Sequence, residues 1–297
     1  MEQQGPIGVF DSGYGGLTVL SEFRKKLPNH DFLYFGDNAR APYGGRSYDV
    51  VYQFTLEAVK FLFDQGCPLV ILACNTASAK ALRTIQQIDL PKLAPNNRVL
   101  GVIRPSTEVL GERTKTGRVG ILGTVGTISS NSFPIELAKF APHIEAFQHA
   151  CPMWVPLIEN QQYEHPAGRQ FIEEDIQKIL SQNADIDTLL LACTHYPVLK
   201  AQIQSLVGPK IQVVPQGPIV AQKLKNYLVA HPEMEARLSK SGAVSYFTSE
   251  TTTVFNQRAQ HFIGEVINAL HHSFSSQLSL RLILVSNTSL SDFCSSG

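Results

Sequence analysis

The sequence predicts an α/β fold of two similar doubly wound parallel-sheet domains, with the active site in the cleft between them. Strand-like apolar runs alternate with helix-like segments along the 297-residue chain, which is typical of βαβ units in a mostly parallel sheet. Two of the apolar runs end alike, since residues 69–77 read LVILACNTA and residues 189–197 read LLLACTHYP. Residues 7–12 and 119–124 form a second matching pair at a similar separation, which favours two halves of like topology. The alternative is that buried parallel strands simply resemble one another.

The first half is predicted to contain three strands, each followed by a helix. In the first helix, apolar residues recur at helical spacing from Leu17 to Leu27, and Pro28 follows them. The second helix has a similar apolar stripe from Val51 to Phe61. The expected strands are residues 6–10, 32–35 and 69–73, and the expected helices are residues 16–27, 47–65 and 77–87.

A segment with two prolines and an Asn-Asn pair, residues 90–98, predicts a linker, after which the pattern restarts. The second half is expected to contain strands at residues 99–103, 118–122, 143–147 and 188–192, and helices at residues 131–140, 168–180 and 198–207. Residues 211–269 add two strands and two helices, and the Ser-rich end reads as a poorly tied terminus or an added strand. We therefore expect a first domain of residues 1–98 plus 215–270, a second domain of residues 99–214, and a tail of residues 271–297.

The composition indicates a protein that binds a small molecule. Lys plus Arg and Asp plus Glu are equal at 25 each, so the chain lacks the basic surface of proteins that bind nucleic acid or anionic membranes. No apolar run approaches the ~20 residues of a membrane span. Residues 1–6 lack the basic and apolar regions of a signal peptide. We therefore expect a cytoplasmic protein with no nucleic-acid or membrane partner.

The cysteines are scattered along the chain. They are Cys67, Cys74, Cys151, Cys193 and Cys294. An odd number without a Cys-x-x-Cys pair argues against a disulfide framework and against a structural zinc site. Cys67 and Cys151 each precede a proline and are interpreted as structural, and Cys294 lies in the tail. A mixed metal site of Cys74, Cys151, Cys193 and His195 stays open as part of an alternative function.

Two loops after strands are candidate ligand sites. Residues 11–16, DSGYGG, open a helix, so that backbone N–H groups and the helix N-terminus face a ligand. The loop does not match the G-x-G-x-x-G dinucleotide motif, and Asp11 would repel a phosphate but suit an ammonium group, so we interpret it as a site for a zwitterion. The alternative is that Asp11 or Ser12 only caps the helix. In residues 38–46, Tyr43 offers an aromatic wall and its neighbours offer backbone donors, although an ordinary tight turn explains the segment equally well.

Cys74 and Cys193 are candidate proton-transfer groups because each follows a buried strand, at the edge where open α/β sheets bind ligands. A free thiol titrates near ~8.5, and a helix N-terminus or a neighbouring imidazole such as His195 lowers that value. The alternative for each cysteine alone is an inert buried thiol, but two in equivalent positions favour a functional pair. The polar candidates for ligand contacts near the strand ends are Asn75, Thr76, Thr124, Thr127 and Thr194, with Glu159 either a site carboxylate or a surface charge.

These residues together resemble the cofactor-independent glutamate racemases. The matching segments occur in family order over about residues 7–200, and the two cysteine motifs are the specific ones. The segments are Asp11-Ser12-Gly13 with Gly15-Gly16, Gly36-Asp37, Pro42-Tyr43-Gly44, Ala73-Cys74-Asn75-Thr76-Ala77, Gly101-Val102-Ile103 with Pro105, Gly123-Thr124 with Thr127, Cys151-Pro152 leading to Glu159, and Cys193-Thr194-His195-Tyr196-Pro197. One departure is Pro215-Gln216-Gly217, where the family often has an Asp-Ser-Gly turn. It puts local structure or regulation in doubt, not the reaction.

The resemblance implies interconversion of L- and D-glutamate without pyridoxal phosphate or another cofactor, and a supply of D-glutamate for bacterial peptidoglycan. It makes Cys74 the base for the D enantiomer and Cys193 the base for the L enantiomer, assisted by Asp11 and His195 respectively, with no metal site. The residues that it assigns to substrate binding are Asp11, Ser12, Pro42, Tyr43, Gly44, Asn75, Thr76, Thr124, Thr127, Glu159, Thr194 and His195. Family members are often homodimers, and the sequence does not indicate which face would pair.

Two other functions stay open from the sequence. A related cysteine-based enzyme could act on aspartate, because one methylene changes binding by only about 1–3 kcal/mol. A two-domain binding protein, or a thiol-ligated metal binder, could close on an amino acid without chemistry. The lack of a secretion signal counts against a binder of the periplasmic type.

Overall fold

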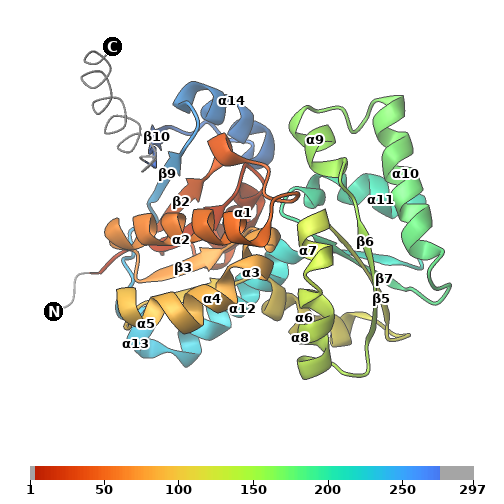
Figure 1. The fold of residues 1–297 in the computed structure, drawn as a ribbon, viewed down its shortest axis with the longest axis horizontal. Coiled ribbons are helices and arrows are strands. Elements are labelled where there is room, and N and C mark those ends of the chain that lie inside the picture. Colours follow the sequence, from red (N-terminus) through yellow and green to blue (C-terminus); the bar gives the residue numbers. More distant parts are fainter. Residues whose placement is uncertain (1–3, 275–297) are drawn as a thin grey trace, which may run out of the picture.

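The computed structural model describes residues 4–274 and contains two parallel β-sheets side by side, each covered by helices (Figure 1). The first sheet has the strand order β10-β9-β2-β1-β3-β4, and the second has the order β6-β5-β7-β8. We call the first sheet with its helices the first lobe, and the second sheet with its helices the second lobe. The first-lobe strands are β1 (Ile7–Asp11), β2 (Phe32–Gly36), β3 (Leu69–Leu72), β4 (Arg98–Gly101), β9 (Val244–Thr248) and β10 (Ala269–His271). The second-lobe strands are β5 (Arg118–Gly123), β6 (Glu145–Ala150), β7 (Thr188–Ala192) and β8 (Gln212–Pro215).

The two lobes share one topology. Four strands of the first lobe lie in the order β2-β1-β3-β4, and the four strands of the second lobe repeat this order as β6-β5-β7-β8. The α/β fold class with two similar parallel sheets is therefore confirmed. Because β3 and β7 occupy equivalent positions, Cys74 and Cys193 follow equivalent strands.

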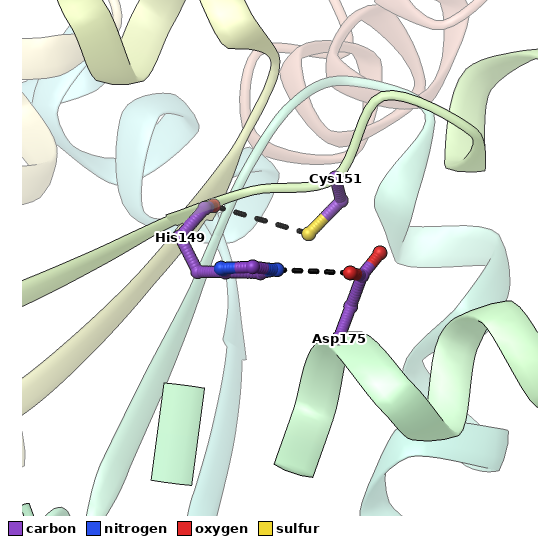
Figure 2. A group of neighbouring side chains, drawn as sticks. All are labelled: His149, Cys151 and Asp175. Carbon is purple, nitrogen blue, oxygen red and sulfur yellow. Dashed lines mark hydrogen bonds and ion pairs between the residues drawn. The ribbon is translucent and has the colours of Figure 1, made fainter. Parts of the chain in front are cut away.

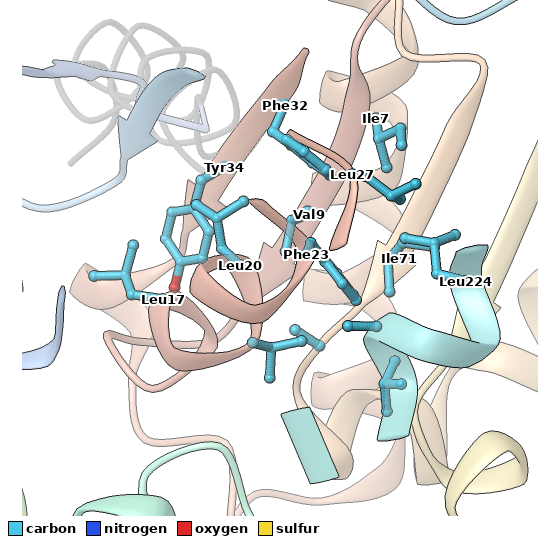
Figure 3. Packing of buried hydrophobic residues seen from close by; sticks show 14 of the residues in the cluster. Ile7, Val9, Leu17, Leu20, Phe23, Leu27, Phe32, Tyr34, Ile71 and Leu224 are labelled. Carbon is cyan, nitrogen blue, oxygen red and sulfur yellow. The ribbon is translucent and has the colours of Figure 1, made fainter. Parts of the chain in front are cut away.

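Strand burial explains why this sequence forms parallel sheets. Strands β1, β2, β3 and β7 are buried at every residue, as expected where helices cover both faces of a sheet. In β1, Ile7 and Val9 join the core on one face, and Phe10 joins the core on the other. Figure 3 shows Ile7 and Val9 packed with Phe23 from the first helix and Leu224 from a helix near the C-terminus. The close packing holds the carboxyl ends of the strands in fixed positions.

Helices connect the strands and cover the sheets. In the first lobe they are α1 (Gly16–Lys26), α2 (Tyr48–Asp64), α3 (Asn75–Lys80), α4 (Leu82–Thr84), α5 (Leu90–Leu93), α12 (Gln216–Ala230), α13 (Pro232–Glu235) and α14 (Thr252–Ile263). In the second lobe they are α6 (Ile103–Arg113), α7 (Val125–Ser129), α8 (Ser132–Phe140), α9 (Trp154–Glu159), α10 (Pro166–Leu180) and α11 (Lys200–Val207). None of the helices within residues 4–274 combines the length and the apolar character that a membrane crossing needs.

One strand lies in a different sheet from the one predicted. The sequence analysis placed residues 99–103 at the start of the second domain, but β4 (Arg98–Gly101) pairs with β3 in the first sheet. Residues 102 and 103 turn away into α6 instead of extending the strand. The expected linker at residues 90–98 also contains α5. The chain thus crosses between the lobes after β4 and returns after β8.

The C-terminal part of the described chain completes the first lobe. The segment from residue 211 to residue 271 contains three strands and three helices, against the two of each that were predicted for residues 211–269. The differences are two short elements, β10 with 3 residues and α13 with 4 residues. Strands β9 and β10 extend the first sheet beside β2. The predicted tail overlaps β10 at His271, and most of it, residues 275–297, lies outside the described residues.

Candidate active site

A cavity of about 240 Å³ lies between the lobes, and both cysteines singled out from the sequence line it. The first lobe contributes Ser12, Gly13, Ala41, Pro42, Tyr43, Gly44, Gly45, Cys74, Asn75 and Thr76. The second lobe contributes Thr124, Val125, Cys151, Pro152, Val155, Pro156, Glu159, Cys193, Thr194 and His195. Of the residues predicted for the site, Asp11 and Thr127 do not line the cavity, since both are fully buried behind its wall.

Cys74 lies two residues after β3, at the N-cap position of helix α3, where its side chain makes no capping hydrogen bond. Its sulfur lies 3.4 Å from the hydroxyl oxygen of Ser12. Burial raises the pKa of the Cys74 thiol to about 12, and the negative charge of Asp11 adds to the rise. The hydrogen bonds from Ser12 and from the backbone of Ala77 act in the opposite direction but are outweighed. Cys74 is therefore a protonated thiol at neutral pH.

Cys193 follows β7 and has an imidazole beside it. The sulfur of Cys193 lies 4.0 Å from Nδ1 of His195, and Nε2 of His195 lies 2.9 Å from Oε1 of Glu159. Burial lowers the pKa of His195, but its hydrogen bonds to Cys193 and Glu159 and their charges outweigh burial and raise it to about 10. At neutral pH His195 is therefore an imidazolium, which stabilises negative charge on the Cys193 sulfur.

Thr194 joins the two lobes next to Cys193. Its hydroxyl donates to both carboxylate oxygens of Asp11, at 3.1 and 3.3 Å, and its backbone carbonyl accepts from the hydroxyl of Thr18 at 2.9 Å. Burial raises the pKa of Asp11 to about 6, although His195 and the Thr194 hydroxyl act to lower it. Gly15 is required here for steric reasons, because a Cβ at this position would lie 2.3 Å from Oγ1 of Thr194.

A cluster of threonine hydroxyls lines or supports the cavity wall near Cys74. Oγ1 of Thr76 lies 2.9 Å from Oγ1 of Thr124 and 3.3 Å from Oγ1 of Thr127. Thr124 also caps helix α7 by accepting from the backbone N–H of Thr127 at 3.2 Å. The cluster therefore joins the first turn of α3 to the first turn of α7, across the two lobes, and offers hydroxyl donors to an anion.

The loop after β2 closes the cavity over the threonines. Tyr43 is buried and donates its hydroxyl hydrogen to Asp37. The carbonyl of Gly44 accepts from the backbone N–H of Gly126 at 2.7 Å, and a Cβ at Gly44 would lie 2.9 Å from Cβ of Thr124. Tyr43 thus lines the cavity, as the sequence predicted, and the close approach of Gly44 to the second lobe was not predicted.

The sequence analysis missed two residues that support the site. Thr18, in the first turns of α1, bonds to the carbonyl of Thr194. Gln216, the first residue of α12, accepts a hydrogen bond from Nδ2 of Asn75 at 2.6 Å. Gln216 belongs to the Pro215-Gln216-Gly217 segment that departs from the family, and this departure was the only feature of the sequence that pointed to it.

One group among residues 4–274 has side chains of the types that bind metals, and Figure 2 shows it. The ligand atoms of His149, Cys151 and Asp175 all lie within 4.8 Å of one another. Nε2 of His149 lies 2.9 Å from Oδ1 of Asp175, and burial, followed by the charge of Asp175, raises the pKa of the Cys151 thiol well above its usual range. The group differs from the mixed site considered from the sequence and shares only Cys151 with it. As it stands, it is a His–Asp pair beside a neutral thiol.

The sequence and the fold of this chain are similar to those of known racemases. A family model described as Asp/Glu/Hydantoin racemase matches residues 18–224. A glutamate racemase from Chlorobaculum parvum is 41% identical over 226 residues, which cover 76% of this chain and 80% of the relative. The crystal structure of a glutamate racemase from Bacillus anthracis is 33% identical, with a TM-score of 0.82 over 92% of this chain and 99% of its own.

A second solved structure, a glutamate racemase from Francisella tularensis in complex with D-glutamate, is 29% identical, with a TM-score of 0.77 over 92% of this chain and 98% of its own. The family model covers more than half of the chain, and the similarity to these relatives extends over both lobes. This chain therefore belongs to the Asp/Glu/Hydantoin racemase family.

Proposed function

We propose that this protein is a glutamate racemase that inverts the amino acid by moving protons at Cα with two cysteines. The observation that carries the proposal is the placement of Cys74 and Cys193, which line one cavity from equivalent strands of two lobes of like topology. Inversion requires a base on one face of a carbon and an acid on the other. Two thiols delivered from two lobes meet this requirement.

The protonation of His195 and Cys74 supports a starting state for one direction of the reaction. His195 is an imidazolium beside the Cys193 sulfur, whereas Cys74 is a neutral thiol. Cys193 would then remove the α-proton of L-glutamate, and the S–H of Cys74 would protonate the opposite face. The reaction leaves a thiol at Cys193 and a thiolate at Cys74, which is the arrangement required for D-glutamate.

The polar groups of the cavity suit the rest of the substrate. The hydroxyls of Thr76 and Thr124 and the backbone donors near Gly44 would bind carboxylates, and Ser12 lies against the Cys74 sulfur. Asp11 would act from behind the wall through Thr194 and through its charge on Cys74, and Thr127 would act through the other threonines. The remaining assignments to Pro42, Tyr43, Asn75 and Glu159 stay predictions.

Proton transfer by side chains is only part of the catalysis. A positioned acid or base contributes typically about 10²–10⁴-fold, which is far too little for an α-proton of such low acidity. Most of the rate enhancement must come from exclusion of water, positioning and hydrogen bonds to the carboxylate of the developing carbanion. A buried cavity between two lobes supplies these conditions once the lobes close on the substrate.

Glutamate is the proposed substrate because the compared relatives are glutamate racemases and one is solved with D-glutamate bound. The product would serve peptidoglycan synthesis, as the family resemblance implies. A cytoplasmic location and a homodimer remain predictions from the sequence. Cell fractionation and the mass measured by light scattering test them.

Deuterium uptake at Cα, measured with polarimetry, tests the function. Purified protein is given D- or L-glutamate in D₂O without added cofactor, and we expect exchange together with loss of optical rotation from either enantiomer. Exchange with aspartate and none with glutamate would retain the mechanism and change the substrate. A protein that exchanges neither amino acid would contradict the proposal and favour a binding protein.

A further inference from the structure

Gln216 lies at one of the two points where the chain crosses between the lobes. Its side chain forms hydrogen bonds to the other crossing and to Asn75, the residue that follows Cys74. Gln216 is the first residue of α12, at the point where the chain returns to the first lobe, and only 3% of its surface is exposed. Its Nε2 donates to Oγ of Ser106 at 2.9 Å and to the carbonyl of Val102 at 3.4 Å, at the other crossing. Its Oε1 accepts from Nδ2 of Asn75.

The direction of these hydrogen bonds follows from the chemistry of the groups. The carbonyl of Val102 can only accept, and the Ser106 hydroxyl donates to it at 2.7 Å. The Ser106 oxygen is therefore left as an acceptor, so the group of Gln216 that faces it must be the NH₂ group. The carbonyl oxygen of Gln216 then faces Asn75, which must present its own NH₂ group in return. The orientations of both amides are thus set by one backbone carbonyl.

The side-chain amide of Asn75 has one group that Gln216 does not use, its carbonyl oxygen. Its Oδ1 is buried and has no hydrogen-bond partner within residues 4–274. Asn75 is 3% exposed and lines the cavity beside Cys74. An unpaired buried acceptor is costly, and the one ligand group in an amino acid that can satisfy it is the ammonium, because ionised carboxylates have no hydrogen to donate.

We infer that Gln216 is a positioning residue that holds the Asn75 amide with its carbonyl oxygen available to the substrate ammonium group. The inference rests on the proposed racemase function. It also gives a role to the one segment that departs from the family pattern. Ser106 and Val102 lie on the crossing segment itself, so the orientation of Asn75 is linked to the geometry of that crossing. A movement of the lobes on closing would therefore act on Asn75 through Gln216.

Gln216→Leu tests the inference, with Gln222→Leu as the matched control on the exposed side of the same helix. Loss of one orienting hydrogen bond corresponds to a change of about 10-fold. Because the ammonium contact exists in both the ground state and the transition state, we expect KM for glutamate to rise about 10-fold, with kcat changed less than about 3-fold. A variant that is only partly folded would lower kcat and leave KM unchanged. KM and kcat equal to those of Gln222→Leu would overturn the inference.

A double-mutant cycle with Asn75→Ala distinguishes positioning from a general structural role. If Gln216 acts through Asn75, Gln216→Leu should have little further effect on KM in the Asn75→Ala background. Independent, multiplied effects would overturn the inference. If the wild-type protein does not racemise glutamate, the proposed function fails and this inference fails with it. That outcome is distinct from an active enzyme in which Gln216→Leu has no effect.

Gln216→Glu keeps the inference testable if the leucine variant does not fold. A protonated Glu retains an acceptor for Asn75 and a donor for Ser106, whereas a carboxylate loses the donor and faces the Val102 carbonyl. We expect the ratio of its KM to the wild-type KM to fall toward one as the pH is lowered. A ratio of one at every pH would overturn the inference.

Discussion

Asp11→Asn should make this protein more stable and less active. Asp11 is fully buried, and burial raises its pKa from 3.8 to about 6. The folded protein thus holds the Asp11 proton more tightly than the unfolded chain does. The resulting destabilisation is absent below about pH 3.8 and develops as the pH rises through about 6.

The structure gives the size of the effect. At 1.36 kcal/mol for each pKa unit, the rise in the pKa of Asp11 costs about 3 kcal/mol of unfolding free energy above the folded pKa. Asparagine has the same shape without the charge. Its NH₂ group takes the place of one of the two carboxylate oxygens that accept hydrogen bonds from the Thr194 hydroxyl and the Gly16 backbone N–H. The loss of one such hydrogen bond costs about 1 kcal/mol of unfolding free energy. We therefore expect Asp11→Asn to raise the unfolding free energy by about 2 kcal/mol at pH 7.5.

Denaturant unfolding at pH 7.5 and pH 4 measures this change, with Asp64→Asn at the exposed end of α2 as the control. The gain should be present at pH 7.5 and nearly absent at pH 4, and the control should stay within about 0.5 kcal/mol of wild type at both pH values. Racemisation should fall, because Asp11 lies behind Cys74 and binds Thr194. An unfolding free energy at pH 7.5 that is unchanged or lower, with the control unaffected, would refute the reasoning.

Two further substitutions test the Cys193 side of the cavity. Glu159→Gln keeps an acceptor for Nε2 of His195 but removes the negative charge that helps to raise the pKa of His195 to about 10. The alkaline fall in kcat/KM should therefore move to lower pH, and an unmoved profile would contradict the ion pair. Gly15→Ala places a Cβ 2.3 Å from Oγ1 of Thr194 and 2.4 Å from Nδ1 of His195, so activity should drop by at least about 10-fold. Gly111→Ala, where the new Cβ meets only ordinary contacts, is the control for Gly15→Ala, and equal activities in the two variants would contradict the steric argument.

The fold could be predicted from the sequence where local pattern decides the structure. Buried strands such as β1, β3 and β7 are continuous apolar runs, and their alternation with helices determines a parallel sheet. The pattern does not say which sheet a strand joins. Strand β4 has only one fully buried residue and follows a linker-like segment, so its place beside β3 is decided by pairing and not by its own sequence.

The residues of the site show the same distinction between features that local sequence determines and features that depend on the assembled fold. Residues that directly follow strands could be predicted, because the carboxyl ends of parallel strands meet at one edge. Thr18 and Gln216 lie inside helix sequences, and their partners Thr194 and Asn75 are 176 and 141 positions away. Such contacts depend on how the two lobes meet, and no local motif encodes that. The bond between Asp11 and Thr194 was missed for the same reason, although each residue was predicted for the site separately.

The cysteine variants separate the two half-reactions, and thermodynamics restricts what they can show. L- and D-glutamate have equal free energies in water, so kcat/KM must be the same in both directions for wild type and for every variant. Cys74→Ser must therefore lose kcat/KM equally from either enantiomer, and the different surroundings of the two thiols can appear only in kcat and KM taken separately. Proton exchange is not restricted in this way. With Cys193 and its imidazolium intact, Cys74→Ser should still exchange the α-proton of L-glutamate in D₂O without inverting it, and Cys193→Ser should do the same only for D-glutamate. Exchange of both enantiomers by either variant would mean that one sulfur reaches both faces of Cα, and the two-base assignment would be wrong.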